Sequence, residues 1–538
     1  MIRDALIQSL SEALGTLEVE PMPETVQLER PAHREHGDWS SNVALAAAKR
    51  AGRNPRELAG ALVALLTTAP PAHVERVELA GHGFVNFHLR DSWLHEVLAE
   101  VVQSGTEGYA RPTPVNGIAE RIQIEFVSAN PTGPVHVGNG WFASYGDALA
   151  RLLERCGHEV SREYYVNDTG GQIRLLGASI LARAKGEPVP ERGYPSDFIK
   201  GLAAAYDGED DVEPAGRWAA GRIISFIRHQ MDSVHIHYDE WFSQASIEDS
   251  AAVDETVDAL AAKGLVFEED GATWLRTADF GDPREQRVLR KSDGDYTYLA
   301  GDLAYHRNKF MVRGFDRVID VWGADHHAQV ASLQAGVEAL GIERGRLEVR
   351  LGQLVSLASG RMSKRLGNAV DLDDLVDDIG ADAMRLLSLL TSIDQPVTID
   401  LDKIRAESRE SPVYYVQYAH TRIASIERVA AERGVQRLAL TAVDLGLLRH
   451  ARELDLLRVL SELPDVVALA AAERAPHKVG TWVRELAGAF HGFYHDCYVM
   501  GDDVPPELTQ ARLWLVEAAR IGFAIGLDLL GVSAPESM

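Results

Sequence analysis

The segment from Arg121 to Cys156 limits the possible folds more than any other part of the sequence. Ile122, Ile124 and Phe126 alternate with polar residues, which predicts a short strand. A loop rich in glycine and proline follows, and apolar or small residues then recur at helical spacing from Trp141 to Cys156. A strand, a loop of this kind and a helix together place backbone N–H groups at the carboxyl edge of a parallel sheet, where phosphates bind.

The loop carries His136, Gly138 and Asn139 where the helix is expected to begin. Loops like this one occur in many nucleotide-binding folds, and many glycine- and proline-rich loops are only turns. His136 would also suit a simple helix cap. The loop alone therefore permits a phosphate site without requiring one.

A second loop, far downstream at residues 359–368, is strongly basic. It follows an alternating run from Leu351 to Leu357 and includes Arg361, Met362, Ser363, Lys364 and Arg365. A basic loop after a strand is usually a solvated turn. Paired with the first loop, it is expected to form the opposite side of a triphosphate site.

The composition indicates a multidomain globular chain. With 538 residues, of which 46% are hydrophobic, we expect three or four domains with buried cores. No run approaches the roughly 18 apolar residues that a membrane-spanning helix needs, and the N-terminus lacks a signal-peptide profile. Cys156 and Cys497 are the only cysteines and lie far apart, so neither a disulfide framework nor a metal site is indicated. We expect a cytoplasmic protein.

The formal net charge of −26 argues on its face against a nucleic-acid partner. Phosphate contacts need lysine and arginine, and an acidic surface repels phosphate. The objection is only partial, because RNA touches one strip of a surface while net charge averages over all of it. The charge therefore weighs against RNA binding without excluding it.

The two loops together carry a resemblance to a known family. His136-Val137-Gly138-Asn139 resembles the HIGH signature of class I aminoacyl-tRNA synthetases, and Arg361 to Arg365 resembles their KMSKS loop. Four longer strings resemble arginyl-tRNA synthetases in particular and follow in the same order along nearly the whole chain: Phe126–Pro134, Tyr164–Asp168, Trp322–His327 and Pro412–His420.

The resemblance implies an α/β fold with three parts. Residues 118–395 would form a Rossmann-like parallel-sheet catalytic domain with an insertion around residues 170–240. Residues 1–103 would form an N-terminal α+β domain that contacts tRNA, although their spacing alone predicts only a structural domain. A joint at residues 103–117 separates the two. Residues 396–538 would form an all-α helical bundle of the DALR anticodon-binding type.

The resemblance also implies an arginine–tRNA ligase, which consumes ATP with Mg²⁺ on its phosphates, forms arginyl-adenylate and charges tRNA(Arg). Catalytic roles would fall to His136, Asn139, Lys364, Arg361 and Arg365. ATP contacts would fall to Gly138, Gly323, Asp325, His326, Met362 and Ser363. Two positions depart from the family pattern, since Asn139 replaces its second histidine and Arg361 replaces its first lysine.

Tyr298 and Asp302 are the predicted contacts for the arginine side chain. If residues 299–307 are helical, the two side chains lie one turn apart on one face. Spacing alone favours a surface pair, whereas the resemblance assigns both to the guanidinium. Further arginine contacts are expected from Glu125, Ser128, Asn130 and Gln244. Gln244 stands where an acidic residue is expected in the family, so this pocket is predicted to carry fewer charges.

The C-terminal part shows helical periodicity, and its aromatic residues are core residues by default. By resemblance, Tyr414, Tyr418 or His420 would face tRNA, where aromatic rings stack on exposed bases. Residues 371–390 are predicted to form one amphipathic helix.

We expect a monomer without a membrane partner and without a protein-bound metal. His326 and His327 are adjacent on a loop and are a poor metal pair. Two other readings stay open: a class I synthetase for another amino acid, and a tRNA-binding paralogue that has lost activity.

Overall fold

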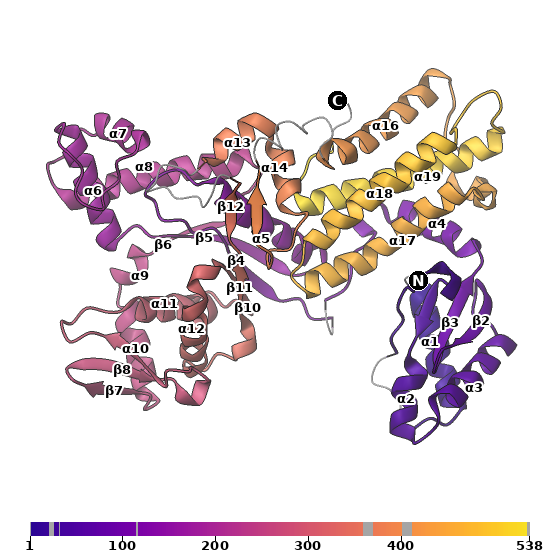
Figure 1. Cartoon of the computed structure of the whole chain (residues 1–538), viewed down its shortest axis with the longest axis horizontal. Coiled ribbons are helices and arrows are strands. Elements are labelled where there is room, and N and C mark those ends of the chain that lie inside the picture. Colours follow the sequence, from indigo (N-terminus) through magenta and orange to yellow (C-terminus); the bar gives the residue numbers. More distant parts are fainter. Residues whose placement is uncertain are drawn as a thin grey trace. The chain divides into compact units, whose positions relative to one another are not determined.

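The computed structural model describes residues 2–20, 26–31, 33–114, 117–358, 370–400 and 412–534. The chain forms two compact units. The first combines Met1–Gly105, Arg428–Ser461 and Ala489–Ala519, and the second combines Thr106–Glu427, Glu462–Gly488 and Arg520–Met538. Figure 1 labels many of the helices and strands of both.

The first unit contains a small antiparallel sheet. Its strands are β1 (Trp39–Ser41), β2 (Val74–Ala80) and β3 (Phe84–Leu89), in the order β1-β3-β2. Four N-terminal helices accompany it: α1 (Ile2–Thr16), α2 (Val43–Ala51), α3 (Pro55–Thr68) and α4 (Ser92–Gly108). The Asn54 side chain caps α3 by accepting hydrogen bonds from the backbone N–H groups of Arg56 and Glu57, at 2.9 and 3.3 Å.

The predicted joint begins later than the sequence suggests. Helix α4 continues through residues 103–108 and is broken inside at Gly105, which has φ 59° and ψ −167°. A left-handed φ is accessible to glycine at little cost, so a composition that reads as a loop is here a broken helix.

A five-stranded parallel sheet organises the second unit. Its strands are β4 (Arg121–Glu125), β5 (Glu159–Val166), β6 (Glu240–Ser243), β10 (Arg317–Gly323) and β11 (Leu347–Gly352). The order β11-β10-β4-β5-β6 reverses direction along the chain between β4 and β10, which makes their carboxyl ends the switch point where ligands bind in such sheets. The predicted Rossmann-like α/β fold is confirmed.

Helix α5 (Val137–Arg155) follows β4 and packs closely on it. A Cβ atom at Gly146 would lie 2.2 Å from the Phe126 ring, so glycine is required for this approach. Gly157 has φ 87° and follows the helix end, as the sequence predicts. The strand, loop and helix therefore form as expected.

Three helices fill the insertion: α6 (Gly170–Ala184), α7 (Asp197–Ala204) and α8 (Val212–Ser233). A Cβ atom at Gly177 would lie 1.9 Å from the Val212 carbonyl oxygen, so glycine lets α6 and α8 meet backbone to backbone.

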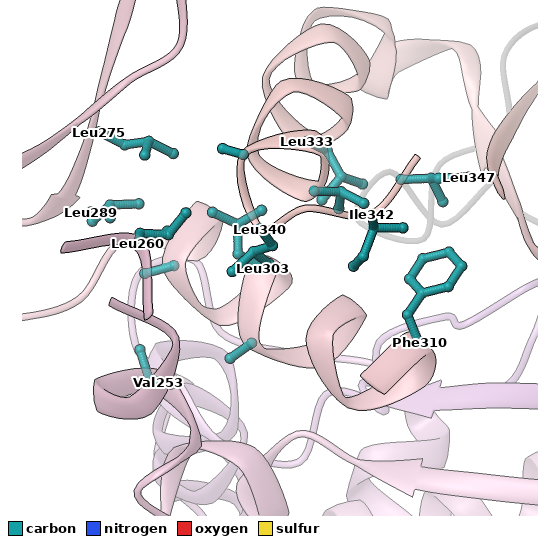
Figure 2. Close-up of a cluster of buried hydrophobic side chains, with 14 of the residues drawn as sticks. Val253, Leu260, Leu275, Leu289, Leu303, Phe310, Leu333, Leu340, Ile342 and Leu347 are labelled. Carbon is teal, nitrogen blue, oxygen red and sulfur yellow. The ribbon is translucent and has the colours of Figure 1, made fainter. Parts of the chain in front are cut away.

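A further lobe lies between β6 and β11. It contains α9 (Ala245–Glu248), α10 (Ala252–Ala262), α11 (Tyr298–Arg307), the π-helical turn η4 (Asn308–Val312), α12 (His327–Ala339) and an antiparallel sheet of β7 (Val266–Glu269), β8 (Ala272–Arg276) and β9 (Gln286–Arg290). Figure 2 shows its core, where Leu260, Leu275, Leu289 and Leu303 are fully buried. This core holds one face of α11 and leaves Tyr298 exposed.

The segment after β11 differs from the predicted single helix. It forms α13 (Leu372–Ile379) and α14 (Ala381–Ser388), separated by Gly380 at φ 84°. Strand β12 (Val355–Leu357) pairs in parallel with β13 (Val397–Ile399), so a short strand follows Pro396.

Four long helices complete the chain: α16 (Pro412–Glu432), α17 (Ala451–Ala472), α18 (His477–Asp496) and α19 (Pro506–Leu530). Within the described ranges, no helix has both the length and the apolar character needed to cross a membrane.

Candidate active site

The start of α5 is fixed by two sets of hydrogen bonds. His136 is the N-cap, and its backbone N–H donates to Oδ1 of Asn139 at 3.2 Å. The Val137 N–H donates to the Val370 carbonyl at 3.0 Å, and the Leu372 N–H donates to the Val135 carbonyl at 3.1 Å. The chain leaving the basic loop therefore returns to the first turn of α5. The loop residues Arg361, Met362, Ser363, Lys364 and Arg365 lie outside the described residues.

The loop after β4 is strained at two residues. Val127 has φ 72° and Ser128 has φ 38°, and positive values are costly for side chains with a Cβ, most of all for a β-branched valine. The Ser128 hydroxyl donates to Oε1 of Glu125 at 2.9 Å and accepts from the Tyr165 N–H at 3.0 Å. Asn130 is exposed in the same loop.

Three buried carboxylates lie side by side on adjacent strands. Glu125 of β4 is in register with Asp320 of β10 and with Glu163 of β5. Residues paired across adjacent strands point to the same face of a sheet. All three side chains are buried, which would be prohibitive without compensating cations. We call these three residues the carboxylate row.

Two cations at the turn that follows α11 compensate the row. The fully buried Lys309 ammonium donates to Oε2 of Glu125 at 2.8 Å and to Oδ1 of Asp320 at 2.9 Å. Arg313 forms a two-pronged ion pair with Glu163, one prong at 3.0 Å. Burial opposes ionisation of Glu163, but Arg313 and Lys309 outweigh it and hold its pKa below the usual range.

Tyr305 and His306 complete the network. The Tyr305 hydroxyl donates to Glu163 and lies 3.0 Å from Oε2 of Glu125, while its ring packs 4.5 Å from the ring of Tyr165. Nε2 of His306 lies 2.8 Å from Oδ2 of Asp320. The row and its partners therefore tie α11 to the centre of the sheet.

A pocket of about 710 Å³ opens beside α11. Tyr298 and Asp302 both line it, so the structure brings the two predicted residues to one wall. Tyr298 is 88% exposed at the mouth, whereas Asp302 is only partly exposed. The remaining lining comes from Trp274, Arg284, Gln286, Arg287, Val288, Thr297, Leu299, Gln329, Ser332 and Leu333.

Asp302 has the electrostatic character expected of a cation ligand. Burial raises its pKa to about 6, while the nearby His306 acts in the opposite direction. Among the described side chains, none donates a hydrogen bond or ion pair to its carboxylate. A guanidinium entering the pocket would supply the missing donors.

Gln244 lies at the end of β6, and its side-chain amide donates to Oε1 of Glu248 at 2.6 Å. The sequence predicts a pocket with fewer charges because of Gln244. Glu248, one turn further along α9, places a carboxylate beside Gln244. The pKa of Tyr165 is raised, mainly by burial, and the Glu248 carboxylate adds to this effect.

Gly323 ends β10 at the switch point, and Asp325 and His326 follow it. The Asp325 side chain is 76% exposed, and Nδ1 of His326 lies 3.3 Å from Oε1 of Gln329 on the next helix. Both side chains are exposed at the carboxyl end of β10, the strand next to β4.

The predicted RNA-facing residues lie on α16. Tyr414 and Tyr418 are 39% and 36% exposed, their rings stack 5.5 Å apart, and Arg422 covers Tyr418. His420 is buried at 7% exposure. The tyrosines therefore offer stacking surface, whereas the histidine offers little.

Three family models match the sequence. Residues 2–89 match the arginyl tRNA synthetase N terminal domain, residues 112–212 and 207–390 match the catalytic domain of tRNA synthetases class I (R), and residues 416–538 match the DALR anticodon binding domain. The chain belongs to the arginyl-tRNA synthetase family.

Similar members of the arginyl-tRNA synthetase family align over nearly their whole length. The arginine–tRNA ligase of Carboxydothermus hydrogenoformans is 43% identical over 532 residues, which cover 95% of this chain and 94% of that protein. The one of Frankia alni is 43% identical over 556 residues, covering 100% and 99%. The solved arginyl-tRNA synthetase of Thermus thermophilus, 23% identical, has the same fold with a TM-score of 0.81 over the whole of both chains.

Several site residues of this arginyl-tRNA synthetase family member could not be predicted from the sequence. Glu163, Tyr305 and Lys309 belong to the network around Glu125, but no motif in the sequence marks them. A charged residue within a buried strand, such as Asp320 in Val-Ile-Asp-Val, is a usable signal, because it needs a buried partner. The partner's identity depends on strand order, which the sequence does not display.

Proposed function

We propose that the protein is an arginine–tRNA ligase that forms arginyl-adenylate from arginine and ATP and then charges the 3′ end of tRNA(Arg). The observation that carries this proposal is the position of Asp302. In a chain of the arginyl-tRNA synthetase family, this partly buried carboxylate without a described donor lines a pocket beside the nucleotide edge of a class I sheet.

The first step needs positioning and charge neutralisation more than covalent help from the protein. An arginine carboxylate oxygen attacks the α-phosphorus of ATP, the bond from that phosphorus to the bridging oxygen breaks, and pyrophosphate leaves. His136, Gly138 and Asn139 would meet the phosphates at the start of α5, where the helix end is positive. ATP would enter as its Mg²⁺ complex.

The basic loop would close the opposite side of the nucleotide. Lys364, helped by Arg361 and Arg365, would neutralise the departing pyrophosphate. Met362 and Ser363 would contact ATP from the same loop. The hydrogen bond from the Val137 N–H to the Val370 carbonyl supports this arrangement, because it holds the chain that follows the loop beside the first turn of α5.

The other end of the nucleotide would lie against β10. Gly323, at the strand end, would let the nucleotide approach the backbone, and Asp325 would accept from a ribose hydroxyl, with His326 beside it. The exposure of Asp325 supports this role.

Arginine would bind with its guanidinium on Asp302 and under Tyr298. Ser128, Asn130 and Gln244 would contact the remainder of the amino acid from the sheet edge. The Glu125 carboxylate already accepts hydrogen bonds from Ser128, Tyr305 and Lys309. These bonds would hold it in a fixed orientation toward the amino acid. In the second step a terminal ribose hydroxyl of tRNA attacks the arginyl carbonyl carbon, and AMP leaves.

Transfer RNA would be held by the domains that flank the catalytic domain. We propose that residues 1–103 and 396–538 contact tRNA and that residues 118–395, with the insertion around 170–240, carry the chemistry. Tyr414 and Tyr418 would stack on bases. His420 is buried and would offer less contact surface to tRNA than the two tyrosines.

We also propose a cytoplasmic monomer. The two cysteines are free and buried, and burial raises the pKa of each thiol to about 11, so neither is poised for oxidation. Light scattering during gel filtration tests the monomer.

One assay tests the reaction and both competing functions. ATP-dependent charging of unfractionated tRNA is measured with each of the twenty amino acids. The proposal expects charging by arginine. Charging by another amino acid instead would identify a different class I synthetase, and no charging by any of them would identify an inactive tRNA-binding paralogue.

A further inference from the structure

The imidazole of His306 joins the arginine pocket to the carboxylate row. Its Nδ1 lies 2.7 Å from the backbone carbonyl oxygen of Asp302, the residue that lines the pocket. Its Nε2 lies 2.8 Å from Oδ2 of Asp320. The His306 side chain is only 3% exposed, so water does not compete for hydrogen bonds with either ring nitrogen.

Both partners of this ring can only accept hydrogen bonds. A backbone carbonyl has no proton to give. Burial opposes ionisation of Asp320, but the Lys309 ammonium, 2.9 Å from Oδ1, leads the interactions that hold its pKa below the usual range, so the carboxylate is ionised. Both ring nitrogens must therefore donate, which makes His306 an imidazolium with one positive charge.

The positive charge of the His306 imidazolium makes the carboxylate row and its partners electrically neutral. Glu125, Glu163 and Asp320 contribute three negative charges. Lys309 and Arg313 contribute two positive charges through the ion pairs described above. The His306 imidazolium supplies the third, so the row and its partners sum to zero.

We propose that His306 is a positioning residue for arginine binding: its buried imidazolium balances the carboxylate row and keeps the Asp302 carboxylate ionised for the guanidinium. The inference rests on the proposed function and deepens it. It assigns the charge state of the pocket to a residue that does not line it. Arginine then meets one ionised carboxylate in front of a neutral network.

Charged and titratable groups approach Asp302 from every surrounding element. They are Tyr298 and His306 on the same helix, Lys309 on η4, Glu125 on β4, Tyr165 on β5, Asp320 on β10, and Arg284 and Arg287 across the pocket. Arg287 is already paired with Asp282, at 2.6 and 2.7 Å. Of these groups, His306 has the largest charge effect on Asp302, and it favours the anion.

The test compares the pH dependence of the arginine Michaelis constant in the wild-type chain and in His306→Gln. Loss of the imidazolium should raise the pKa of Asp302, so the midpoint of the pH dependence of the arginine Michaelis constant should move upward by about one pH unit. With a wild-type midpoint near 6, such a shift raises the constant about threefold at pH 6.5 and leaves it unchanged at pH 8.5. A purely structural role would raise it equally at both pH values.

The double variant His306→Gln/Asp320→Asn removes one charge of each sign. It should return the midpoint to within about 0.3 unit of the wild-type value. Partial unfolding lowers the measured rate but leaves a Michaelis constant unaffected, because only folded molecules bind arginine. An unchanged midpoint in His306→Gln, or a double variant no closer to wild type than the single variant, would overturn the inference.

Different results would overturn the proposed function and the proposed role of His306. If the wild-type chain does not charge tRNA with arginine, the proposed function falls, and this inference falls with it. If the wild-type chain charges arginine normally and His306→Gln keeps the wild-type midpoint, this inference alone falls.

Discussion

The Asp147 carboxylate on α5 accepts a 2.5 Å hydrogen bond from Nη2 of Arg385 on α14, and both side chains are almost completely buried. Arg151 and Arg162 donate to the same carboxylate at 2.9 and 3.1 Å. Burial disfavours the anion, but the three guanidinium groups outweigh it and hold the pKa of Asp147 below its usual range. The pair links the helix that begins at the carboxyl edge of the parallel sheet to a helix that follows the basic loop in the sequence.

Asp147→Asn should lower the free energy of unfolding by about 3–5 kcal/mol, because it leaves the buried Arg385 without its counter-ion. Urea unfolding followed by circular dichroism measures this change. Asp210→Asn is the matched control, since its partner Lys185 is exposed and the pair should contribute nothing measurable. Equal stability of the two variants would contradict the structural role of Asp147.

Asp302→Ala should raise the apparent Michaelis constant for arginine by about 100-fold, because a charged hydrogen-bond partner of the guanidinium is lost. The constant for ATP should change by less than about threefold. Steady-state charging of tRNA measures both constants. Asp279→Ala, at an exposed carboxylate of the same lobe, should alter neither. An arginine dependence unchanged by Asp302→Ala would refute the pocket assignment.

Arginine binding should weaken in acid through Asp302. The pKa of this group is raised to about 6 in the empty pocket, so it takes up a proton as the pH falls through that value. The guanidinium needs the ionised form. The arginine Michaelis constant should therefore be flat above about pH 7 and rise about tenfold per unit well below pH 6. A constant for ATP with the same midpoint would assign the titration to another group.

Lys364→Ala should lower the turnover number by about 100-fold, because the residue is proposed to act on charge that develops as pyrophosphate leaves. Arginine binding should remain within about twofold of wild type. Pre-steady-state adenylate formation and arginine titration measure the two separately. Lys364→Arg, which keeps the charge, should recover part of the rate. An unaltered rate in Lys364→Ala would exclude the closing role of the basic loop.

Local patterns in the sequence predicted a large part of the fold and of the pocket. The alternation of Ile122, Ile124 and Phe126 fixes β4, and the one-turn spacing of Tyr298 and Asp302 places both on one wall of the pocket. These features depend on neighbours within a few residues, which the sequence displays directly. The family resemblance implies roles for these residues that spacing alone does not assign.

Long-range features could not be predicted in the same way. The carboxylate row exists because β4, β5 and β10 are adjacent and in register, and because a π-helical turn brings Lys309 over them. Neither strand order nor a π-helical turn has a local signature here. The break at Gly380 is hidden in the same way, because the amphipathic spacing continues across it while the helical backbone does not.

The central claim is that the pocket selects a guanidinium by its charge. Charging of tRNA with arginine and with citrulline, its neutral near-isostere, tests this most directly through the ratio of their kcat/KM values. A site built on an obligatory ionic contact should favour arginine by about 10⁴-fold or more. A ratio below about tenfold, or charging of neither compound, would contradict the account.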